Sequence, residues 1–220
     1  MRVLALETAT RVCGVALVEG GTILASKEVD EKHVHAERLM GLIDEVTRDQ
    51  SGIGAIGAVA VSLGPGSFTG LRIGVSVAKG IAYGSEIALV GVPTLDALIE
   101  RARVLSTIVK PGDKIVALLQ ARRGEYYVAE EGNPEVHVMP AAKISNAYSR
   151  HGIILTGDCD TLGPATELRA VELAVRRCSA ESVGILGERM ILEGKRDDVR
   201  TLEPLYTLEF LLNPDLTERT

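Results

Sequence analysis

Residues 62–72 read SLGPGSFTGLR and join two apolar segments of the chain. The run at 55–61 predicts a buried strand, and the run at 71–83 predicts a helix. Between them, Gly64-Pro65-Gly66 predicts a turn with one fixed φ and two residues free to adopt positive φ. Such a strand–turn–helix segment has two uses. It can present the N–H groups of the helix to an anion, or it can hold the helix at a fixed angle for packing against another body.

The composition is that of a globular protein with room for one large domain or two small lobes. Of the 220 residues, 46% are hydrophobic, 25% are charged and 3% are aromatic. The net charge of −6 argues against a protein that binds nucleic acid unaided, because such proteins usually carry a basic face. Membership of a complex whose partner supplies that face stays open.

The cysteines and the N-terminus indicate a reducing compartment. Cys13, Cys159 and Cys178 are far apart and form no CxxC pair, so we expect buried thiols. The N-terminus reaches an acid, Glu7, too early for a signal peptide. No apolar run approaches the roughly 20 residues that a membrane span needs. We therefore expect a cytoplasmic protein with no membrane contact.

The order of the predicted elements indicates an α/β chain in two lobes. Strands are expected at 2–6, 12–18 and 23–29, then a helix at 35–48, the strand at 55–61, the helix at 71–83, a strand at 87–90 and a helix at 95–105. After this β-β-β-α-β-α-β-α order, the sequence KPGD at 110–113 breaks the chain. The second half has predicted strands at 115–119, 125–130, 136–139 and 153–156, with helices at 144–150 and 180–192. We expect an N-terminal lobe at 1–109 and a reduced second lobe at 110–220, with the tail at 204–220 on the surface or packed back on the first lobe.

Two sets of residues are candidates for chemistry. Glu7 and Thr8 end the first strand, where phosphate-handling two-lobed folds place an acid and a hydroxyl, although they also fit a polar strand end held by local hydrogen bonds. His33 and His35 can bind a metal with Glu37 if they lie on a strand. On a helix their rings point about 200° apart, which favours a structural or partner-contact role.

Other motifs limit the choice of function. The chain has no G-x-S-x-G and no H-E-x-x-H sequence, which argues against a hydrolase with either kind of site. The sequence RRGEYY at 122–127 mixes bases, an acid and aromatic rings at a predicted hairpin. It can contact an anion or RNA, or it can be an ordinary exposed turn with one ring facing in.

The helix at 71–83 is apolar or small around more than half of its circumference. Gly70, Gly74, Ala78 and Ala82 form a row without bulk, so another helix backbone can approach closely. Either the helix at 35–48 covers this surface, or a second molecule does.

Several segments resemble a known family. SLGPGSFTGLRIG at 62–74 is similar to the signature stretch of the bacterial TsaB proteins, LALETA at 4–9 to their opening strand, and HAERL at 35–39 to their first helix. ARRGEYY at 121–127 and PLY at 204–206 match further landmarks in order. The resemblance implies an actin-like fold of two lobes (sugar kinase/Hsp70-type, ribonuclease H-like) with the second lobe reduced.

The resemblance also implies work on tRNA, where a threonylcarbamoyl group is installed on the adenosine beside the anticodon. TsaB is the non-catalytic paralogue of the transferase TsaD in that system, and it binds TsaD together with the ATPase TsaE. The chain would then meet tRNA only through the complex. The implied contact surface lies on the first two helices, and from it we predict an interface of Leu39, Met40, Ile43, Gly70, Ile73, Gly74, Val77 and Ala78. On that assignment, a bulky residue at Gly74 abolishes the complex and leaves the monomer folded.

Two departures from the family favour a scaffold over an enzyme. The family often has Asp in place of Glu7 and commonly Asp in place of Gln120. We therefore expect no cofactor of the chain's own, with ATP at the interface with TsaD left open. The alternatives are an actin-like phosphotransferase or ATPase that uses Glu7 and Thr8, and a metallopeptidase that uses His33 and His35. For the isolated chain we expect a homodimer through the same helices.

Overall fold

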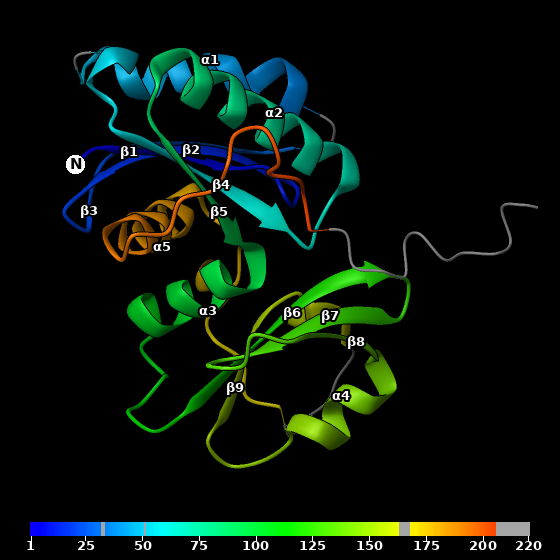
Figure 1. Cartoon of the computed structure of the whole chain (residues 1–220). Coiled ribbons are helices and arrows are strands. Elements are labelled where there is room, and N and C mark those ends of the chain that lie inside the picture. The colour runs from blue at the N-terminus through cyan, green and yellow to red at the C-terminus, as the bar shows by residue number, and fades with distance from the viewer. Residues whose placement is uncertain (32–33, 51, 163–167, 206–220) are drawn as a thin grey trace, which may run out of the picture.

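The computed structural model describes residues 1–31, 34–50, 52–162 and 168–205, which form two lobes on two sheets (Figure 1). The first sheet has the strand order β3-β2-β1-β4-β5 and the second has the order β8-β7-β6-β9. The first half of the chain consists of β1 (Val3–Glu7), β2 (Val12–Glu19), β3 (Thr22–Asp30), α1 (His35–Arg48), β4 (Ala58–Gly64), α2 (Phe68–Ser85), β5 (Ala88–Pro93) and α3 (Thr94–Leu105). The second half consists of β6 (Lys114–Arg122), β7 (Glu125–Glu130), β8 (Val136–Pro140), α4 (Ala141–Tyr148), β9 (Ile153–Gly157) and α5 (Ala180–Leu192). The predicted element order of the first half is confirmed.

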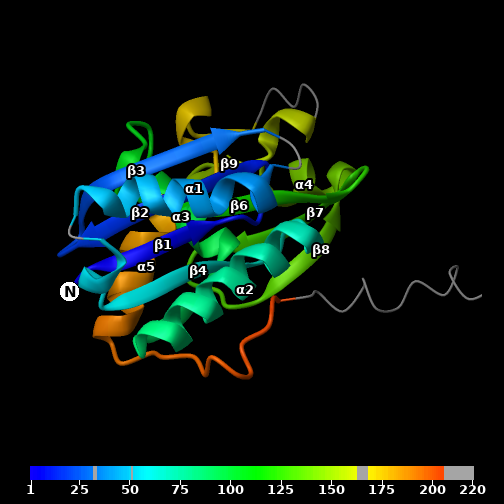
Figure 2. The same ribbon diagram turned by 90° about the horizontal axis from the view of Figure 1, so that it is seen from above.

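Helices cover both faces of the first sheet. Figure 2 shows α1 and α2 lying across the strands on one face, and Figure 1 shows α5 and α3 on the other. The central strand β1 pairs antiparallel with β2 and parallel with β4, and all of its residues are buried. This burial explains why β1 is apolar along its whole length up to Glu7, since a strand covered on both faces has no solvent side. None of the described helices combines the length and the apolar character needed to cross a bilayer.

The turn at residues 64–66 differs from the sequence prediction in its glycines. Only Gly64 has positive φ, at 111°, whereas Gly66 is needed for a different reason. A side chain at Gly66 would place its Cβ 2.3 Å from the Ala9 carbonyl oxygen, in the turn between β1 and β2. The helix begins at Phe68 rather than at residue 71, because Ser67 Oγ accepts a hydrogen bond from Gly70 N at 3.3 Å and caps it.

The helix α5 packs on the first lobe, although the expected lobe boundary at 109/110 assigns it to the second lobe. It packs on the face of the first sheet opposite α1 and α2 (Figure 1). At Gly184 an added Cβ would lie 2.5 Å from Val18 Cγ2, and at Gly187 it would lie 2.4 Å from Ala60 Cβ. These glycines let the helix backbone approach the sheet closely, so the residues from 180 to 205 belong with the first lobe.

The segment after α5 runs back along the first lobe. Asp197 accepts a hydrogen bond from Gly91 N at 2.7 Å, and its own N–H donates to Leu89 O at 2.8 Å, which covers the edge of β5. At its end, Leu205 N donates to Leu63 O at 2.8 Å. The rest of the tail, for which we expected a surface position, lies outside the described residues.

A buried carboxylate ties α5 to the hairpin between β2 and β3. Glu188 is 4% exposed, and its two oxygens accept hydrogen bonds from Gly20 N and Gly21 N, both at 2.7 Å. Replacing Glu188 with Ala should lower the free energy of unfolding by about 2 kcal/mol, because charged hydrogen bonds are lost and a cavity is left. Urea denaturation measures this loss. Glu193→Ala, an exposed position at the end of the same helix, is the matched control, and an equal loss in the two variants would contradict the prediction.

Candidate functional site

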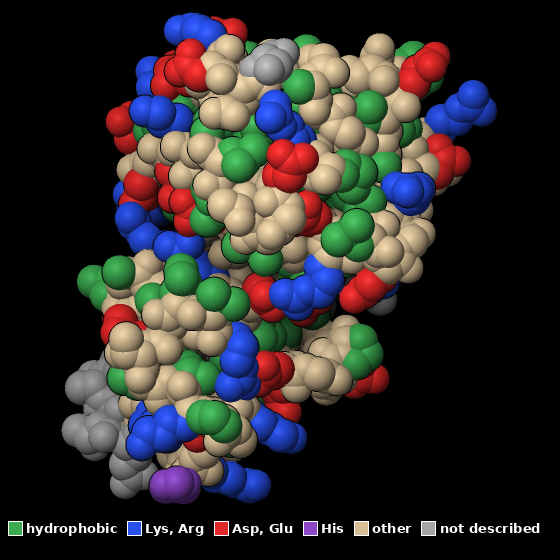
Figure 3. Space-filling view, turned by 90° about the vertical axis from the view of Figure 1, so that its left-hand side faces the viewer, with side chains coloured by type: hydrophobic (Ala, Val, Ile, Leu, Met, Phe, Trp, Pro, Cys, Tyr) green, Lys and Arg blue, Asp and Glu red, His purple; other side chains and the backbone are tan. Residues whose placement is uncertain are grey.

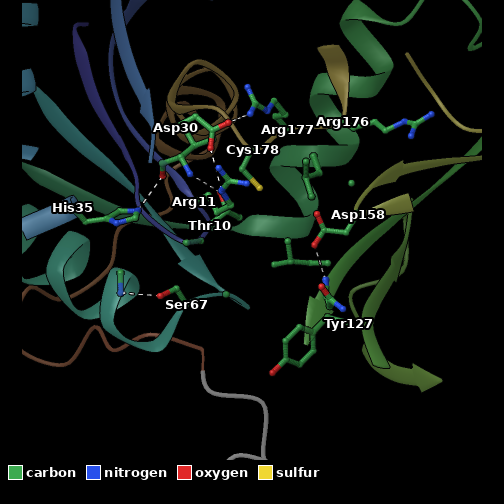
Figure 4. Close-up of a pocket in the computed structure, with 18 of the residues that line it drawn as sticks. Thr10, Arg11, Asp30, His35, Ser67, Tyr127, Asp158, Arg176, Arg177 and Cys178 are labelled. Atoms are coloured by element: carbon green, nitrogen blue, oxygen red, sulfur yellow. Dashed lines mark hydrogen bonds and ion pairs between the residues drawn. The ribbon is translucent and has the colours of Figure 1, made fainter. Parts of the chain in front are cut away.

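A cleft of about 830 Å³ lies between the lobes (Figure 4). With the molecule placed as in Figure 1, the upper wall belongs to the first lobe and comes from the turn between β1 and β2 and from the start of α2. The lower wall belongs to the second lobe and comes from β6, β7 and the end of β9. The cleft lining includes Thr10, Arg11, Ser67, Tyr127, Asp158 and Arg177. Because these residues come from distant segments, the cleft is the natural candidate for a functional site in a two-lobed fold.

The cations of the cleft are held by carboxylates of the same chain. Arg11 Nε lies 3.4 Å from Asp30 Oδ1, and Arg177 forms an ion pair with the other oxygen of Asp30 (Figure 4). Arg176 pairs with Asp160 across the end of the second sheet. An anionic ligand in the cleft would have to compete with these carboxylates for the guanidinium groups.

Asp158 and Gln120 meet at the lower wall. Asp158 Oδ2 accepts a hydrogen bond from Gln120 N at 2.8 Å, and burial raises the pKa of the Asp158 carboxyl. The Gln120 side chain is neutral, so it adds no charge beside this desolvated carboxyl.

Glu7 and Thr8 lie behind the upper wall, and neither lines the cleft. Glu7 is fully buried, its Oε1 accepts a hydrogen bond from Ala9 N at 2.7 Å, and burial raises its pKa to about 8. Thr8 is also fully buried, and its N–H donates to Ser62 Oγ at 3.1 Å. Of the two alternatives for these residues, their position favours the polar strand end held by local hydrogen bonds over a pair that faces a nucleotide.

The row of small residues on α2 packs against this same turn. At Gly70 an added Cβ would lie 2.1 Å from Thr8 O, and at Gly74 it would lie 2.1 Å from Thr8 Oγ1. The absence of side chains lets α2 approach the backbone of the first strand's end, within the same chain. A leucine at Gly74 would thus collide with the core, which corrects the expectation of a folded monomer that has lost only its complex.

The predicted interface residues divide into two groups. Buried in the described structure are Leu39, Ile43, Gly70, Gly74 and Ala78, which cannot contact a partner without unfolding. Met40 is 55% exposed, and Ile73 and Val77 are partly exposed. Only these three remain available on the outer surface of the first two helices. The helical wheel could not separate the groups, since it does not show which arc faces the sheet.

Of the histidine and hairpin candidates, His35 and Tyr127 line the cleft (Figure 4). His33 lies outside the described residues, and His35 is 7% exposed with Nε2 3.3 Å from Val12 O. Within the part of the chain that the structure describes, no three His, Cys, Asp or Glu side chains gather as metal ligands. In the hairpin of β6 and β7, Tyr126 is buried and Tyr127 lines the cleft.

The last residues to place are the three cysteines and the pair Asp30 and Arg177. Cys13, Cys159 and Cys178 are free and buried, as predicted, and burial raises the pKa of the Cys178 thiol beside the cleft. The sequence analysis did not select Asp30 or Arg177 for the cleft. Their ion pair joins the end of β3 to the segment before α5, and no local sequence motif predicts such a long-range contact.

The contact between Thr8 and Gly74 can be tested by a double-mutant cycle. Gly74→Ala should lower the free energy of unfolding by roughly 2 to 4 kcal/mol, because the new Cβ overlaps Thr8 Oγ1. Thr8→Ala in the same chain should recover part of that loss, since the overlapping atom is gone. Gly80→Ala, on the same helix with no atom within 4 Å of the added Cβ, should stabilise the protein instead. Additive effects of Thr8→Ala and Gly74→Ala would exclude the proposed contact.

The buried carboxyl of Glu7 predicts a pH dependence of stability. The folded-state pKa of about 8 exceeds the ordinary value of 4.5, so the folded protein keeps a proton that the unfolded chain releases. The stabilisation is complete below pH 4.5 and is lost as the pH rises to about 8, by on the order of 5 kcal/mol. Glu7→Gln mimics the protonated acid and should flatten this slope in denaturation curves between pH 5 and 8, whereas the exposed Glu45→Gln should not. Equal slopes in wild type and Glu7→Gln would refute the assignment.

Comparison with known proteins identifies relatives over nearly the whole chain. The family model for TsaD, tRNA N6-adenosine threonylcarbamoyltransferase, matches residues 23–148. The tRNA threonylcarbamoyladenosine biosynthesis protein TsaB of Escherichia coli is 31% identical, and the match covers 94% of each chain. The TsaB of Haemophilus influenzae is 32% identical over 131 residues, which is 59% of this chain and 53% of that relative.

Solved structures agree on the fold. YeaZ from Pseudomonas aeruginosa has a TM-score of 0.78 at 24% identity, covering 94% of this chain and 99% of that one. The ethanolamine utilization protein EutJ from Carboxydothermus hydrogenoformans has a TM-score of 0.50 at 11% identity, covering 85% and 90%. With the two lobes and the cleft between them, these neighbours show the actin-like fold. The chain carries a TsaD-type domain and belongs to the TsaB family of tRNA threonylcarbamoyladenosine biosynthesis proteins.

Proposed function

We propose that this chain is a non-catalytic partner subunit in the synthesis of threonylcarbamoyladenosine in tRNA, acting with TsaD and TsaE in the cytoplasm. The role in this tRNA modification follows from membership of the TsaB family. The observation that carries the subunit role is an exposed surface of α1 and α2 that combines apolar and small residues. A surface of this kind favours close packing against another protein.

The composition of that surface supports the proposal. Met40, Ile73 and Val77 supply apolar area on the outer side of the two helices. Beside them, Gly41 and Gly80 are exposed, and no atom lies within 4 Å of a Cβ built on either. We call Met40, Gly41, Ile73, Val77 and Gly80 the partner face. Its glycines point to solvent, unlike Gly70 and Gly74, so a partner helix can approach there.

The inner cleft supports a non-catalytic role. The acid that phosphate-handling relatives would use, Glu7, is buried behind the wall with a pKa raised to about 8. A protonated carboxyl in that position offers no charge to a metal–nucleotide complex. The cleft arginines are already paired with Asp30 and Asp160. We therefore propose that the chain needs no cofactor of its own, and that any ATP requirement belongs to the partners or to their interface with this chain.

The partner face is tested by adding bulk where the fold tolerates it. Gly80→Leu should leave the fold intact, since the position is exposed and leucine favours a helix more than glycine does. It should weaken binding to TsaD at least about tenfold, roughly 1.4 kcal/mol, because the side chain separates the two surfaces. Titration calorimetry measures the affinity. The same variant should slow tRNA modification by TsaD and TsaE and should shift any homodimer of the isolated chain toward monomer.

The matched control is Asn146→Leu, which adds the same side chain at an exposed position on α4 in the second lobe. It should bind TsaD like the wild type. Unchanged affinity of Gly80→Leu would refute the partner face. Tight ATP–Mg binding and turnover by the isolated chain would instead favour the phosphotransferase alternative.

A further inference from the structure

Basic side chains gather at one end of the second lobe. Figure 3 shows Lys, Arg and His side chains at the lower end of the molecule. We call the basic residues around Asp113 and Gly152, which contacts of Arg103, Lys110, Lys114 and Arg169 bring together, the basic corner. It consists of Arg103, Lys110, Lys114, Arg150, His151 and Arg169. Figure 1 shows that the loop leading into β6 lies at the end of the molecule opposite α1 and α2. A protein bound to the partner face would therefore leave this corner accessible.

Backbone hydrogen bonds hold the basic segments side by side. Lys114 N donates to Gly152 O at 2.8 Å, which joins the start of β6 to the start of β9. Arg150 O accepts a hydrogen bond from Ile153 N at 3.2 Å in the same turn. Lys110 N donates to Asp113 Oδ2 at 3.0 Å and closes the loop before β6. These bonds place the loop that carries Lys110 and Lys114 beside the turn that carries Arg150.

The carboxylates within the corner already have partners. Glu131 forms an ion pair with Arg103, and its Oε2 also accepts a hydrogen bond from Ile115 N at 3.2 Å. Asp113 Oδ2 lies 3.8 Å from Arg169 Nη2 and accepts the hydrogen bond from the loop described above. Both acids are therefore occupied by a neighbouring arginine.

The carboxylates on the adjoining strands are occupied as well. Glu130 Oε1 accepts a hydrogen bond from Tyr148 Oη at 2.9 Å, and Glu135 Oε2 lies 3.6 Å from His137 Nε2. In contrast, Lys110, Lys114 and Arg150 are exposed and form no ion pair with any described residue. Lys110, Lys114 and Arg150 are therefore the cations of the corner with which no described carboxylate pairs, whereas Glu130 and Glu172, whose partners are neutral hydroxyl and amide groups, keep their negative charge nearby.

We propose that the basic corner binds the phosphate backbone of RNA, which gives the chain a direct contact with the tRNA beyond the contact made through its partners. This inference rests on the proposed function, since the RNA is the one being modified. Long cationic side chains on surface loops can contact phosphates singly and release the counterions of the RNA. An acidic protein partner would need a contiguous, well-packed patch around the same charges, and the corner is built from loops and strand ends.

The negative net charge of the whole chain limits where RNA can bind. With a net charge of −6, most of the protein surface repels RNA. Lys110, Lys114 and Arg150, which form no ion pair with a described residue, then mark the part of the surface that the RNA approaches. A contact of this kind is weak by itself, so it adds to binding only when the assembled complex already holds the RNA.

The test uses the complex of this chain with TsaD and TsaE and measures the steady-state kinetics of tRNA modification at several salt concentrations. The variant carries Lys110→Gln, Lys114→Gln and Arg150→Gln together, which removes the charges and keeps most of each side-chain stem. The KM for tRNA should rise severalfold while kcat stays the same. The slope of log KM against log salt concentration should decrease by about 2 to 3, since each lost phosphate contact removes nearly one counterion.

The matched control carries Lys195→Gln, Arg196→Gln and Arg200→Gln, which are exposed on the first lobe and change the net charge equally. It should retain the wild-type KM and slope. A corner variant with unchanged KM and slope would overturn the proposal, as would equal effects of both triple variants. Loss of TsaD or TsaE from the purified complex, without a change in the salt slope, would also overturn it and assign the corner to a protein partner. If the wild-type chain adds nothing to modification by TsaD and TsaE, the proposed function itself fails.

Discussion

The close approach of α2 to the turn between β1 and β2 is the constraint on which the rest of the structure depends. Ser67 N donates to Ala9 O at 2.6 Å, and Cβ atoms at Gly66 and Gly70 would lie within 2.3 Å of backbone oxygens of this turn. This contact fixes the angle at which α2 leaves the first sheet. Because α2 is set by backbone contacts on its inner side, its outer side is presented at a defined position and can serve as a surface for a partner.

The same contact explains the state of the cleft. Glu7, at the start of this turn, is fully buried, and burial raises the pKa of its carboxyl to about 8. The fold has a cleft between two walls, but Glu7 lies behind one wall and the cleft arginines pair with carboxylates of the same chain. An actin-like architecture is thus compatible with a role that depends on surfaces, since function resides in sites and not in the fold.

The two ends of the molecule then have different chemistry. Apolar and small residues lie on the outer side of α1 and α2, whereas Lys110, Lys114 and Arg150, without an ion pair among the described residues, lie around the start of β6. The helix α3 joins these ends, because it packs against β6 of the second sheet and also against α5 and the strands β4 and β5 of the first lobe. The two proposed contacts, with a protein partner at one end and with RNA at the other, would need such rigidity between them.

The sequence by itself determined the order of the elements, the buried cysteines and the family, since periodicity, turn residues and the motif at 62–74 are local signals. It also identified α2 as unusually rich in small residues. Only the tertiary structure decided which side those residues face. Gly74 is needed against Thr8, inside the chain, while Gly80 is open to solvent, and a helical wheel shows the two glycines without their neighbours. The return of α5 to the first lobe and the pairing of Asp30 with Arg177 were likewise undetermined by the sequence, because both contacts join segments far apart in the chain and leave no local pattern.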